Sequence, residues 1–531
     1  MIKKYFYLIL VLILTIGWVL RIVNLDKNPP HLGNDEISIA FDSYSVRMIG
    51  KDEWGHSWPL SFESHRTYKA PLYAYLNMPI NYLLGNNEVG VRLLSAIAGI
   101  LVIFLMAVIA KVWSGERVAL VAAIIMALNP KSIFAARIAF ESNLAFMIMT
   151  LGILLMYFYR KTDKKIYALV AGLVLGLSIW GYHTEWILTP MLAVVLPWLS
   201  RKSFSLKKWW LMWLTLIIAA LPIFYNFVTI QSKDESNRAS SQIWLKEPGA
   251  TVITPVTNYL QHFSLDSLFI SGADIFNGES PLEQGWFLLT TLPLLILGLI
   301  NLKVVYKKYW DWILTWWLLC PVVPALTAGG VASVRNLAFL VPTILIMAAG
   351  FEWLIKKSKI GTIILSGLFF INFFIFGLAY FIHFPIDSGD NFQYGYKQAW
   401  EFIKPMANNY DQIVVETKFG NTGQYAGLPH LYFGYFGAFG VEEMQYKIND
   451  NGTKIGKFYF KYVDWNKEEL KPKTIYIVSV INPMAGKAEG KLNLLGKIEK
   501  PNHETQFWIY EVKVKNFKIN QIRSFSLNHI K

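Results

Sequence analysis

The chain has 531 residues, of which 54% are hydrophobic, 15% are aromatic and only 16% are charged. Because charged residues make up about 25% of an average protein, this composition excludes an ordinary soluble enzyme and indicates a protein with many membrane spans. The formal net charge of +14 does not indicate nucleic-acid binding, because many lysines and arginines form short clusters between apolar segments, where the cytoplasmic loops of membrane proteins collect them.

The first predicted element is a membrane span at the N-terminus. Residues 1–23 begin with Lys3 and Lys4 and continue as an apolar core of about twenty residues, which is long enough to cross a bilayer. A signal peptide is the alternative, but no small-residue cleavage site follows. We therefore expect a retained span that enters from the cytoplasm, because the two lysines precede it.

Ten further apolar stretches are expected to span the membrane, which makes eleven spans in total. They lie near residues 91–112, 117–134, 142–159, 166–182, 185–199, 208–227, 286–306, 311–328, 335–355 and 359–383. With the N-terminus inside, the inner loops carry many lysines and arginines and the outer turns carry few, as the positive-inside rule requires. We therefore expect a multi-pass protein of the plasma membrane, with residues 24–90, 228–285 and the C-terminal region on the outer side.

The composition changes after His383. Residues 384–420 suggest an amphipathic helix and then a strand that ends at a glycine turn. Three later segments have the pattern of strands: TIYIVSVI, LLGKIEK and TQFWIYEVKV. The last two are joined around Pro501 and Asn502, as in a hairpin.

These patterns predict two domains. Residues 1–383 form an all-α polytopic membrane domain, with a large outer loop at 24–90 that contains interfacial helices and a second outer loop at 228–285. Residues 384–531 form a small extracytoplasmic α/β domain.

A polar, aromatic and charged stretch, residues 31–94, follows the first span. It opens with adjacent carboxylates, Asp35 and Glu36, after the turn-forming Gly33 and Asn34 and before the apolar spacing of an interfacial helix. Carboxylates held against a membrane face are costly, which indicates a functional role. The alternative is that Asp35 caps the helix by accepting hydrogen bonds from first-turn amides. On the dipeptide alone, capping and catalysis explain it equally well.

An ordered set of motifs in this region resembles a known family. NDE at 34–36, GKDEWG at 50–55, YKAPLY at 68–73 and GNNEVGVRLLSAIAGI at 85–100 are similar to the first outer loop of GT-C glycosyltransferases, in particular the bacterial protein-mannosyltransferase and aminoarabinose-transferase group. The resemblance is strongest over residues 1–200. It implies a GT-C fold and the transfer of one sugar from a polyprenyl-phosphate carrier to a protein, lipid or cell-envelope glycan acceptor on the outer face.

The resemblance also implies roles for acidic residues. Asp35 matches the family's acidic position and is the expected general base for the acceptor hydroxyl, with Glu36 as the alternative or a supporting acid. Family members of this type invert the anomeric centre in one displacement. Glu141, at the outer start of a span, matches a further acidic position and is expected to orient the acceptor or the sugar. Its alternatives are favourable placement at a helix N-terminus and pairing with Arg137.

Cationic and aromatic residues are candidates for binding the donor. Lys69 matches the family's lysine before proline and is expected to neutralise charge on the departing lipid phosphate. Its alternative is snorkelling among tyrosines such as Tyr68, and Tyr68 is expected to stack on a sugar unless it belongs to an interfacial aromatic belt. Arg335 is costly at the outer end of a span without an anionic partner, and a lipid phosphate is a natural one; snorkelling is again the alternative. Arg238 is a weaker candidate of the same kind.

One family feature is absent. The aminoarabinose transferases have an arginine shortly after their acidic pair, where this chain has Ile37, Ser38 and Ile39. This departure argues against their particular sugar.

The outer turn WGYHTEWILTP, residues 180–190, contains His183 and Glu185. We expect His183 to form a hydrogen bond at the sugar site or to act as an interfacial anchor, because the spacing of histidines and carboxylates fits no metal pattern. The single cysteine, Cys320, excludes an internal disulfide and a cysteine-rich zinc site. The sequence therefore identifies no cofactor and does not support a divalent metal.

Two other classes of function remain open. A secondary transporter or lipid flippase should show broken spans, repeat symmetry and ionisable residues near mid-membrane, whereas the acidic residues here gather at the outer ends of spans. An oligosaccharyl transferase or ligase of the same fold would handle a long glycan, and the outer loops alone do not separate it from a monosaccharide transferase. The expected partners are a polyprenyl-phosphate sugar, an acceptor and membrane lipids, with no nucleic acid.

Overall fold

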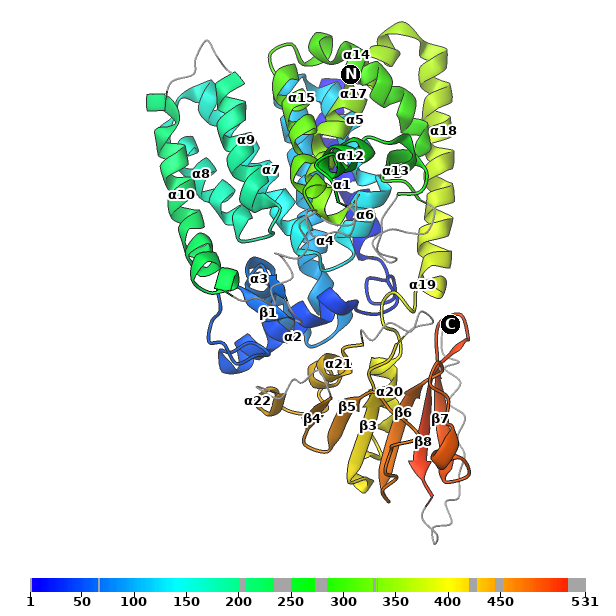
Figure 1. The fold of residues 1–531 in the computed structure, drawn as a ribbon. Coiled ribbons are helices and arrows are strands. Elements are labelled where there is room, and N and C mark those ends of the chain that lie inside the picture. Colours follow the sequence, from blue (N-terminus) through cyan, green and yellow to red (C-terminus); the bar gives the residue numbers. More distant parts are fainter. Residues whose placement is uncertain are drawn as a thin grey trace. The chain divides into compact units, whose positions relative to one another are not determined.

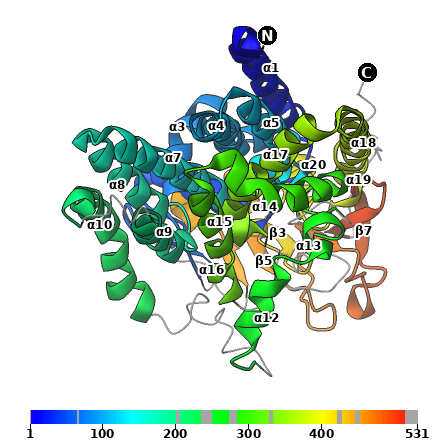
Figure 2. The same cartoon turned by 90° about the horizontal axis from the view of Figure 1, so that it is seen from above.

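The structure, a computed structural model, describes residues 2–64, 67–199, 206–233, 250–272, 284–327, 331, 333–419, 427–444 and 452–513. The chain divides into two compact units, whose elements are labelled in Figure 1 and seen from above in Figure 2. The first unit comprises Met1–Leu25, Pro59–Gly85 and Val89–Phe384. The second unit comprises Asp26–Trp58, Asn86–Glu88 and Pro385–Lys531.

In the described part of the chain, seven helical segments are long and apolar enough to cross a membrane. They are Lys4–Ile22 within α1 (Ile2–Ile22), Glu88–Trp113 (α4), Glu141–Thr162 (α7), Leu206–Thr229 (α10), Leu289–Tyr306 with α14 (Leu292–Tyr306), Val334–Lys357 with α17 (Leu340–Lys357) and Lys359–Asp387 with α18 (Lys359–Leu378). Two shorter apolar helices are α8 (Lys165–Ile179) and α9 (Glu185–Leu199). The predicted all-α polytopic class is confirmed, whereas the count of eleven spans is not.

One predicted span is broken. The stretch predicted over 117–134 consists of α5 (Glu116–Ala127) and α6 (Pro130–Ala136), which are bent by 61°. Asn129 begins α6 by accepting a hydrogen bond from the backbone amide of Ser132, and the guanidinium of Arg21 donates to carbonyls at the end of α5, including that of Ala127 at 3.1 Å. These bonds satisfy backbone groups that a break would otherwise leave unpaired in an apolar medium.

The helices α7, α8, α9 and α10 lie together on one side of the first unit (Figures 1 and 2). Among these helices, α7 is much more buried than α10, the other long one. It carries Glu141 in its first turn and Arg160 and Lys161 in its last turn, and both placements are favourable for the helix dipole. It ends at Asp163, which has a left-handed backbone with φ of 60°. The charge pattern along this helix therefore matches its observed limits.

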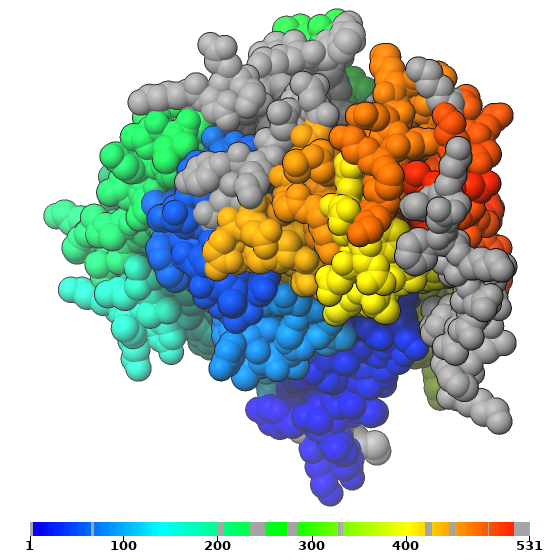
Figure 3. Space-filling model, turned by 90° about the horizontal axis from the view of Figure 1, so that it is seen from below, coloured from blue at the N-terminus to red at the C-terminus, as the bar shows by residue number. Residues whose placement is uncertain are grey.

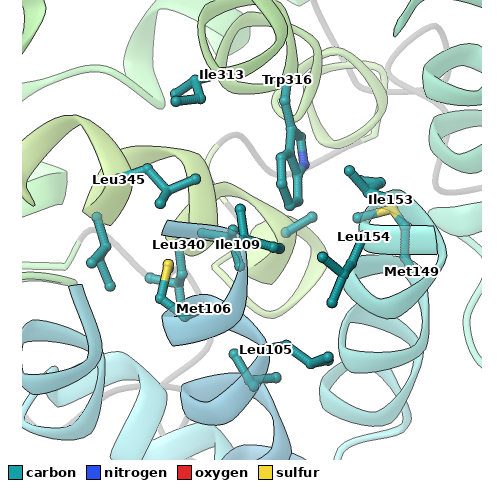
Figure 4. Close-up of a cluster of buried hydrophobic side chains, with 14 of the residues drawn as sticks. Leu105, Met106, Ile109, Met149, Ile153, Leu154, Ile313, Trp316, Leu340 and Leu345 are labelled. Atoms are coloured by element: carbon teal, nitrogen blue, oxygen red, sulfur yellow. The ribbon is translucent and has the colours of Figure 1, made fainter. Parts of the chain in front are cut away.

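The core of the first unit is built from α4, α7, α15 (Trp310–Leu319) and α17. The side chains that meet there are Leu105, Met106, Ile109, Met149, Ile153, Leu154, Ile313, Trp316, Leu340 and Leu345 (Figure 4). Glycines bring α14 and α17 unusually close: a Cβ on Gly350 would lie 2.1 Å from the carbonyl oxygen of Leu294. Such close backbone approach through small residues is a usual basis of helix packing in membranes.

The second unit contains a six-stranded sheet with the order β4-β5-β3-β6-β8-β7. Its strands are β3 (Gln412–Glu416), β4 (Thr453–Ile455), β5 (Phe458–Lys461), β6 (Thr474–Ser479), β7 (Leu492–Glu499) and β8 (Thr505–Val512). The central strand β3 pairs in parallel with β5 and β6, and β7 and β8 form the predicted antiparallel hairpin. With α20 (Tyr396–Ile403) before β3, this confirms a small α/β region; β4 and β5 were not predicted.

The helix that carries the acidic pair belongs to this second unit. It is α2 (Asn34–Ile49), and it packs on α21 (Pro429–Tyr435). The contact is tight, because a Cβ on Gly434 would lie 2.8 Å from the ring of Phe41. In Figure 3 the blue atoms that follow the first span border the amber atoms of the segment around α21.

Candidate functional site

The two carboxylates at the start of α2 lie in different environments. Glu36 is buried, and its Oε2 accepts a hydrogen bond of 2.9 Å from the backbone amide of Gly33, the residue before the helix. This is the usual geometry of a carboxylate three residues into a helix that caps its first turn. The side chain of Asp35 is exposed. The observed cap therefore involves Glu36 and gives this carboxylate a structural role.

The GKDEWG motif forms a turn organised by Asp52. This buried carboxylate accepts hydrogen bonds from the backbone amides of Trp54 and His56, at 3.0 and 2.8 Å, and lies 3.2 Å from Nδ1 of His56. Gly50 and Gly55 have φ of 72° and 89°, which glycine adopts without steric cost. The motif thus has a clear role in folding the loop after α2.

Lys69 and His183 meet in one pocket of the first unit. Lys69 is the last residue of β2 (Thr67–Lys69), which pairs with β1 (Phe62–Ser64), and it is followed by α3 (Leu72–Leu84). The amide of Leu72 donates to the carbonyl of Trp180, at 3.2 Å, and this bond ties α3 to the turn that carries His183. The pocket is lined by Ser61, Lys69, His183, Trp186 and Gln231, among others.

The electrostatics of this pocket keep His183 neutral. Burial, and in second place the charge of Arg335, lower the pKa of His183 from 6.5 to about 4. A neutral imidazole has one donor and one acceptor nitrogen, so it can hydrogen-bond to a hydroxyl in either direction. Its ring also lies 4.8 Å from the ring of Trp186, measured between centroids. The pocket therefore combines one cation, one neutral imidazole and an aromatic face.

A network of neutral polar groups at this pocket was not predicted. Asn226, in the last turns of α10, accepts hydrogen bonds from Ser61 Oγ at 2.7 Å and from Gln231 Nε2 at 3.1 Å, and all three residues are buried. The sequence signal was present, because an amide inside an apolar helix is costly unless it has a partner.

Arg335 and a second cation reach one segment of the first unit. Arg335 is partly buried and donates to Thr327 Oγ1 at 2.7 Å. Lys131, which no sequence pattern singled out, is buried, and its Nζ bonds to Oγ of Ser333, two residues before Arg335. Two cations are therefore held close to the start of η4 (Val334–Phe339).

Glu141 and its neighbour occupy defined positions. Glu141 is the first residue of α7 and is partly buried. The guanidinium of Arg137 is buried and donates to the carbonyls of Leu20 and Asn24, at 3.0 and 3.1 Å. Leu20 is in the last turn of α1 and Asn24 follows the helix, so Arg137 caps its C-terminal end.

The remaining candidates are spread over the chain. Tyr68 is buried in β2, and Arg238 lies outside the described residues. The catalytic candidates Asp35 and Glu36 belong to the second unit, whereas Lys69, Glu141, His183 and Arg335 belong to the first. Over the described ranges, no group of three or more histidine, cysteine or acidic side chains is arranged to hold a metal ion.

Comparison with known proteins identifies one matching family and several similar folds. The family model of the dolichyl-phosphate-mannose-protein mannosyltransferases matches residues 68–226. That segment contains Lys69, Glu141, His183 and Asn226. The comparison with curated protein sequences finds no match.

Among solved structures, ArnT from Cupriavidus metallidurans in the apo state superposes with a TM-score of 0.56 at 13% sequence identity, covering 94% of this chain and 97% of that chain. The same protein bound to undecaprenyl phosphate gives the same values. The archaeal oligosaccharyltransferase AglB from Archaeoglobus fulgidus, in complex with an inhibitory peptide and a dolichol-phosphate, has a TM-score of 0.45 at 12% identity, over 78% of this chain and 62% of that chain. From the superposition with ArnT, the chain has an ArnT-like GT-C fold, and residues 68–226 are similar to the mannosyltransferase family model.

Proposed function

We propose that the protein transfers a single sugar from a polyprenyl-phosphate donor to a protein, lipid or cell-envelope glycan acceptor on the outer face of the plasma membrane. The observation that carries this proposal is the pocket shared by Lys69 and His183, because the segment matched by the mannosyltransferase family model contains both residues. One similar structure, ArnT from Cupriavidus metallidurans, was solved bound to undecaprenyl phosphate, which supports the choice of carrier.

The proposed reaction is a direct displacement. The acceptor oxygen attacks the anomeric carbon, the bond between that carbon and the phosphate oxygen breaks, and the phosphate leaves with the bonding electron pair. Asp35 takes the proton of the acceptor hydroxyl as general base. The exposure of Asp35, and the capping bond already made by Glu36, support Asp35 as the base.

Other residues have supporting roles in this proposal. Lys69 and Arg335 neutralise charge that builds up on the departing phosphate. His183, which is neutral at pH 7, forms hydrogen bonds with the sugar, and Glu141 orients the sugar or the acceptor. Tyr68 and Arg238 are weaker candidates for the donor site, and no step requires a metal.

The test uses the purified protein in lipid nanodiscs. It is supplied with undecaprenyl phosphates that carry mannose, glucose, galactose or 4-amino-arabinose, together with acceptors extracted from the envelope of its own organism. Mass spectrometry should detect released undecaprenyl phosphate and an acceptor heavier by one sugar. Failure with all four donors, combined with unchanged envelope glycans in a gene-deletion strain, would contradict the proposal.

A transporter or flippase is a second candidate because of one observation, the 61° bend between α5 and α6. A flippase moves the lipid-linked sugar without breaking the bond between sugar and phosphate. Intact donor on the opposite leaflet, with no release of undecaprenyl phosphate, would therefore favour it. An oligosaccharyl transferase would instead act only on a donor that carries a long glycan, which is added as a fifth arm of the same assay.

A separate experiment tests on which side of the membrane residues 384–531 lie. A periplasmic or extracellular reporter fused at Asp390 should be active on the outer side if residues 384–531 are extracytoplasmic. A reporter active only in the cytoplasm would remove one span from the proposed topology and would place the C-terminal region on the wrong side for outer-face chemistry.

A further inference from the structure

His31 and Leu32, which lead into α2, are held by side chains and a backbone carbonyl from the C-terminal part of the second unit. His31 is completely buried, and its Nδ1 donates to the carbonyl oxygen of Phe392 at 3.1 Å. The His31 ring stacks on the ring of Tyr432, with centroids 4.8 Å apart and planes inclined by 28°. The imidazole is therefore fixed at one edge by a hydrogen bond and on one face by an aromatic ring.

Tyr432 makes a second contact with the same segment. Its hydroxyl donates to the carbonyl oxygen of Leu32 at 2.6 Å, and the whole side chain is buried. Since Tyr432 also stacks on His31, one side chain contacts two consecutive residues, three and four positions before Asp35. A short hydrogen bond between buried groups of this kind is expensive to lose, because the carbonyl would remain unsatisfied.

Gln393 holds the first residue of the helix itself. Its side-chain amide donates to Oδ1 of Asn34, and its Oε1 accepts from the backbone amide of Leu428 at 3.3 Å. Gln393 is buried and has φ of 48°, a left-handed backbone that is uncommon for a residue other than glycine. Such a conformation persists only where the surroundings determine it, and it is often found at functional sites.

These contacts are concentrated on the entrance to α2, the end that carries Asp35. The body of α2 is held separately, by Phe41 against Gly434 and by the edge of Tyr44 against the ring of Tyr435, at 6.1 Å. Packing of the helix body alone would keep α2 in its unit. The additional bonds from Tyr432 and Gln393 restrict the backbone directly before the proposed base.

We propose that Tyr432 and Gln393 are positioning residues, which hold the start of α2 so that the carboxylate of Asp35 meets the acceptor hydroxyl in a productive geometry. This inference rests on the proposed function. It assigns the C-terminal α/β region a part in catalysis that acts through Asp35, with no contact to the substrate required. A misplacement of a catalytic group by about 1 Å can lower the rate by about 10²-fold.

The test compares three variants that each remove one polar group. Tyr432→Phe keeps the ring that stacks on His31 and removes the bond to Leu32. Gln393→Met keeps the length of the side chain and removes both of its hydrogen bonds. Tyr396→Phe is the matched control: Tyr396 is buried, stacks on Tyr432 at 5.5 Å and donates to the carbonyl of Glu416 at 3.1 Å, away from residues 31–34.

Two readouts are measured on the full-length protein in nanodiscs. The first is kcat and the donor KM, with the undecaprenyl-phosphate sugar that the donor panel identifies. The second is hydrogen–deuterium exchange of residues 31–40, which requires no substrate. We expect Tyr432→Phe to lower kcat by about 10- to 100-fold with KM almost unchanged, and to increase exchange at residues 31–40. Tyr396→Phe should leave kcat and the exchange of this segment as in the wild type.

Each contrary result has a distinct meaning. Normal kcat in both Tyr432→Phe and Gln393→Met overturns the positioning role, even if exchange increases. An equal loss of kcat in Tyr396→Phe overturns it as well, because general weakening of the unit would then explain the effect. Gln393→Met serves as the test if Tyr432→Phe does not fold. Normal turnover in Asp35→Asn would show instead that the proposed function has failed in its choice of base, whatever the exchange data show.

Discussion

In the second unit, a carboxylate at each end of α2 accepts hydrogen bonds from backbone amides nearby in the sequence: Glu36 from Gly33 before the helix, and Asp52 from Trp54 and His56 after it. In the first unit, Lys69 and His183 instead line a pocket, beside a neutral network around Asn226. Both regions bury ionisable groups, but Lys69 and His183 come from segments far apart in the sequence and line one small pocket. Burial of a charged group is therefore a poor sign of function by itself; the direction in which the group faces is more informative.

The largest expected effect distinguishes Asp35 from Glu36, the two carboxylates at the start of α2. Asp35→Asn keeps size and hydrogen bonding but cannot accept a proton, so kcat should fall by about 10²–10⁴-fold. Glu36→Gln can still accept the bond from Gly33 through its amide oxygen, so kcat should fall far less. Both are measured by release of undecaprenyl phosphate, with protein amount and folding checked by size-exclusion chromatography. The reverse order of effects would transfer the role of base to Glu36.

The next prediction concerns Lys69, the cation that lines the pocket of the first unit. Lys69→Met keeps most of the apolar stem and removes the charge, and kcat should fall by about 10²-fold if the cation acts on the leaving phosphate in the transition state. Donor KM should change little in that case. Lys404→Met, at an exposed lysine of the second unit, is the control and should be neutral. A rise in KM at constant kcat would show that Lys69 contributes only to ground-state binding.

Arg335→Met extends this test to a second cation. If both cations contact one phosphate, the double variant Lys69→Met with Arg335→Met should lose less activity than the product of the two single losses. Two independent losses that multiply would place the cations on different groups. Full activity of both single variants would make them interfacial anchors.

A smaller effect concerns the scaffold that supports the pocket. Gly350→Val places a side chain against the carbonyl of Leu294 and should destabilise the packing of α14 on α17 by about 1–3 kcal/mol. Gly367→Val, in α18, is the matched control, since a Cβ there has no neighbour within 4 Å. The comparison is made by thermal unfolding in detergent. Equal loss in both variants would mean that helix propensity, and not close packing, accounts for the change.

The last expected effect is the pH dependence of stability caused by His183, which is spread over more than two pH units. Its pKa in the folded state is about 4, below the ordinary 6.5, so between these values the unfolded chain binds more protons than the folded one. The free energy of unfolding therefore falls as the pH falls from 6.5 to 4, by at most about 1.4 kcal/mol per pH unit from this group. His183→Gln removes the titration and should flatten this part of the stability curve. An unchanged slope would show that His183 is not the group responsible.

Much of the fold followed from local sequence patterns. Long apolar stretches predicted the helices α4, α7 and α10, because an apolar segment of this length has no other stable state than a spanning helix. The hairpin of β7 and β8 also followed from its local pattern. The bend at Asn129 did not, since it depends on Arg21, a residue more than a hundred positions away in the sequence that satisfies the carbonyls at the break.

The candidate side chains were chosen from the sequence alone, but their surroundings were decided by the tertiary structure. The sequence predicted that Lys69 and His183 lie in loops between apolar segments. Only the folded chain brings them into one pocket, because β2 and the turn before α9 are far apart in the sequence. Likewise, the sequence identified Asp35 and Glu36 as a pair, and only the structure distinguished the exposed carboxylate from the buried cap. The physical reason is the same in both cases. Charge and apolarity are properties of single residues, whereas desolvation and hydrogen-bond partners depend on distant segments that folding brings together.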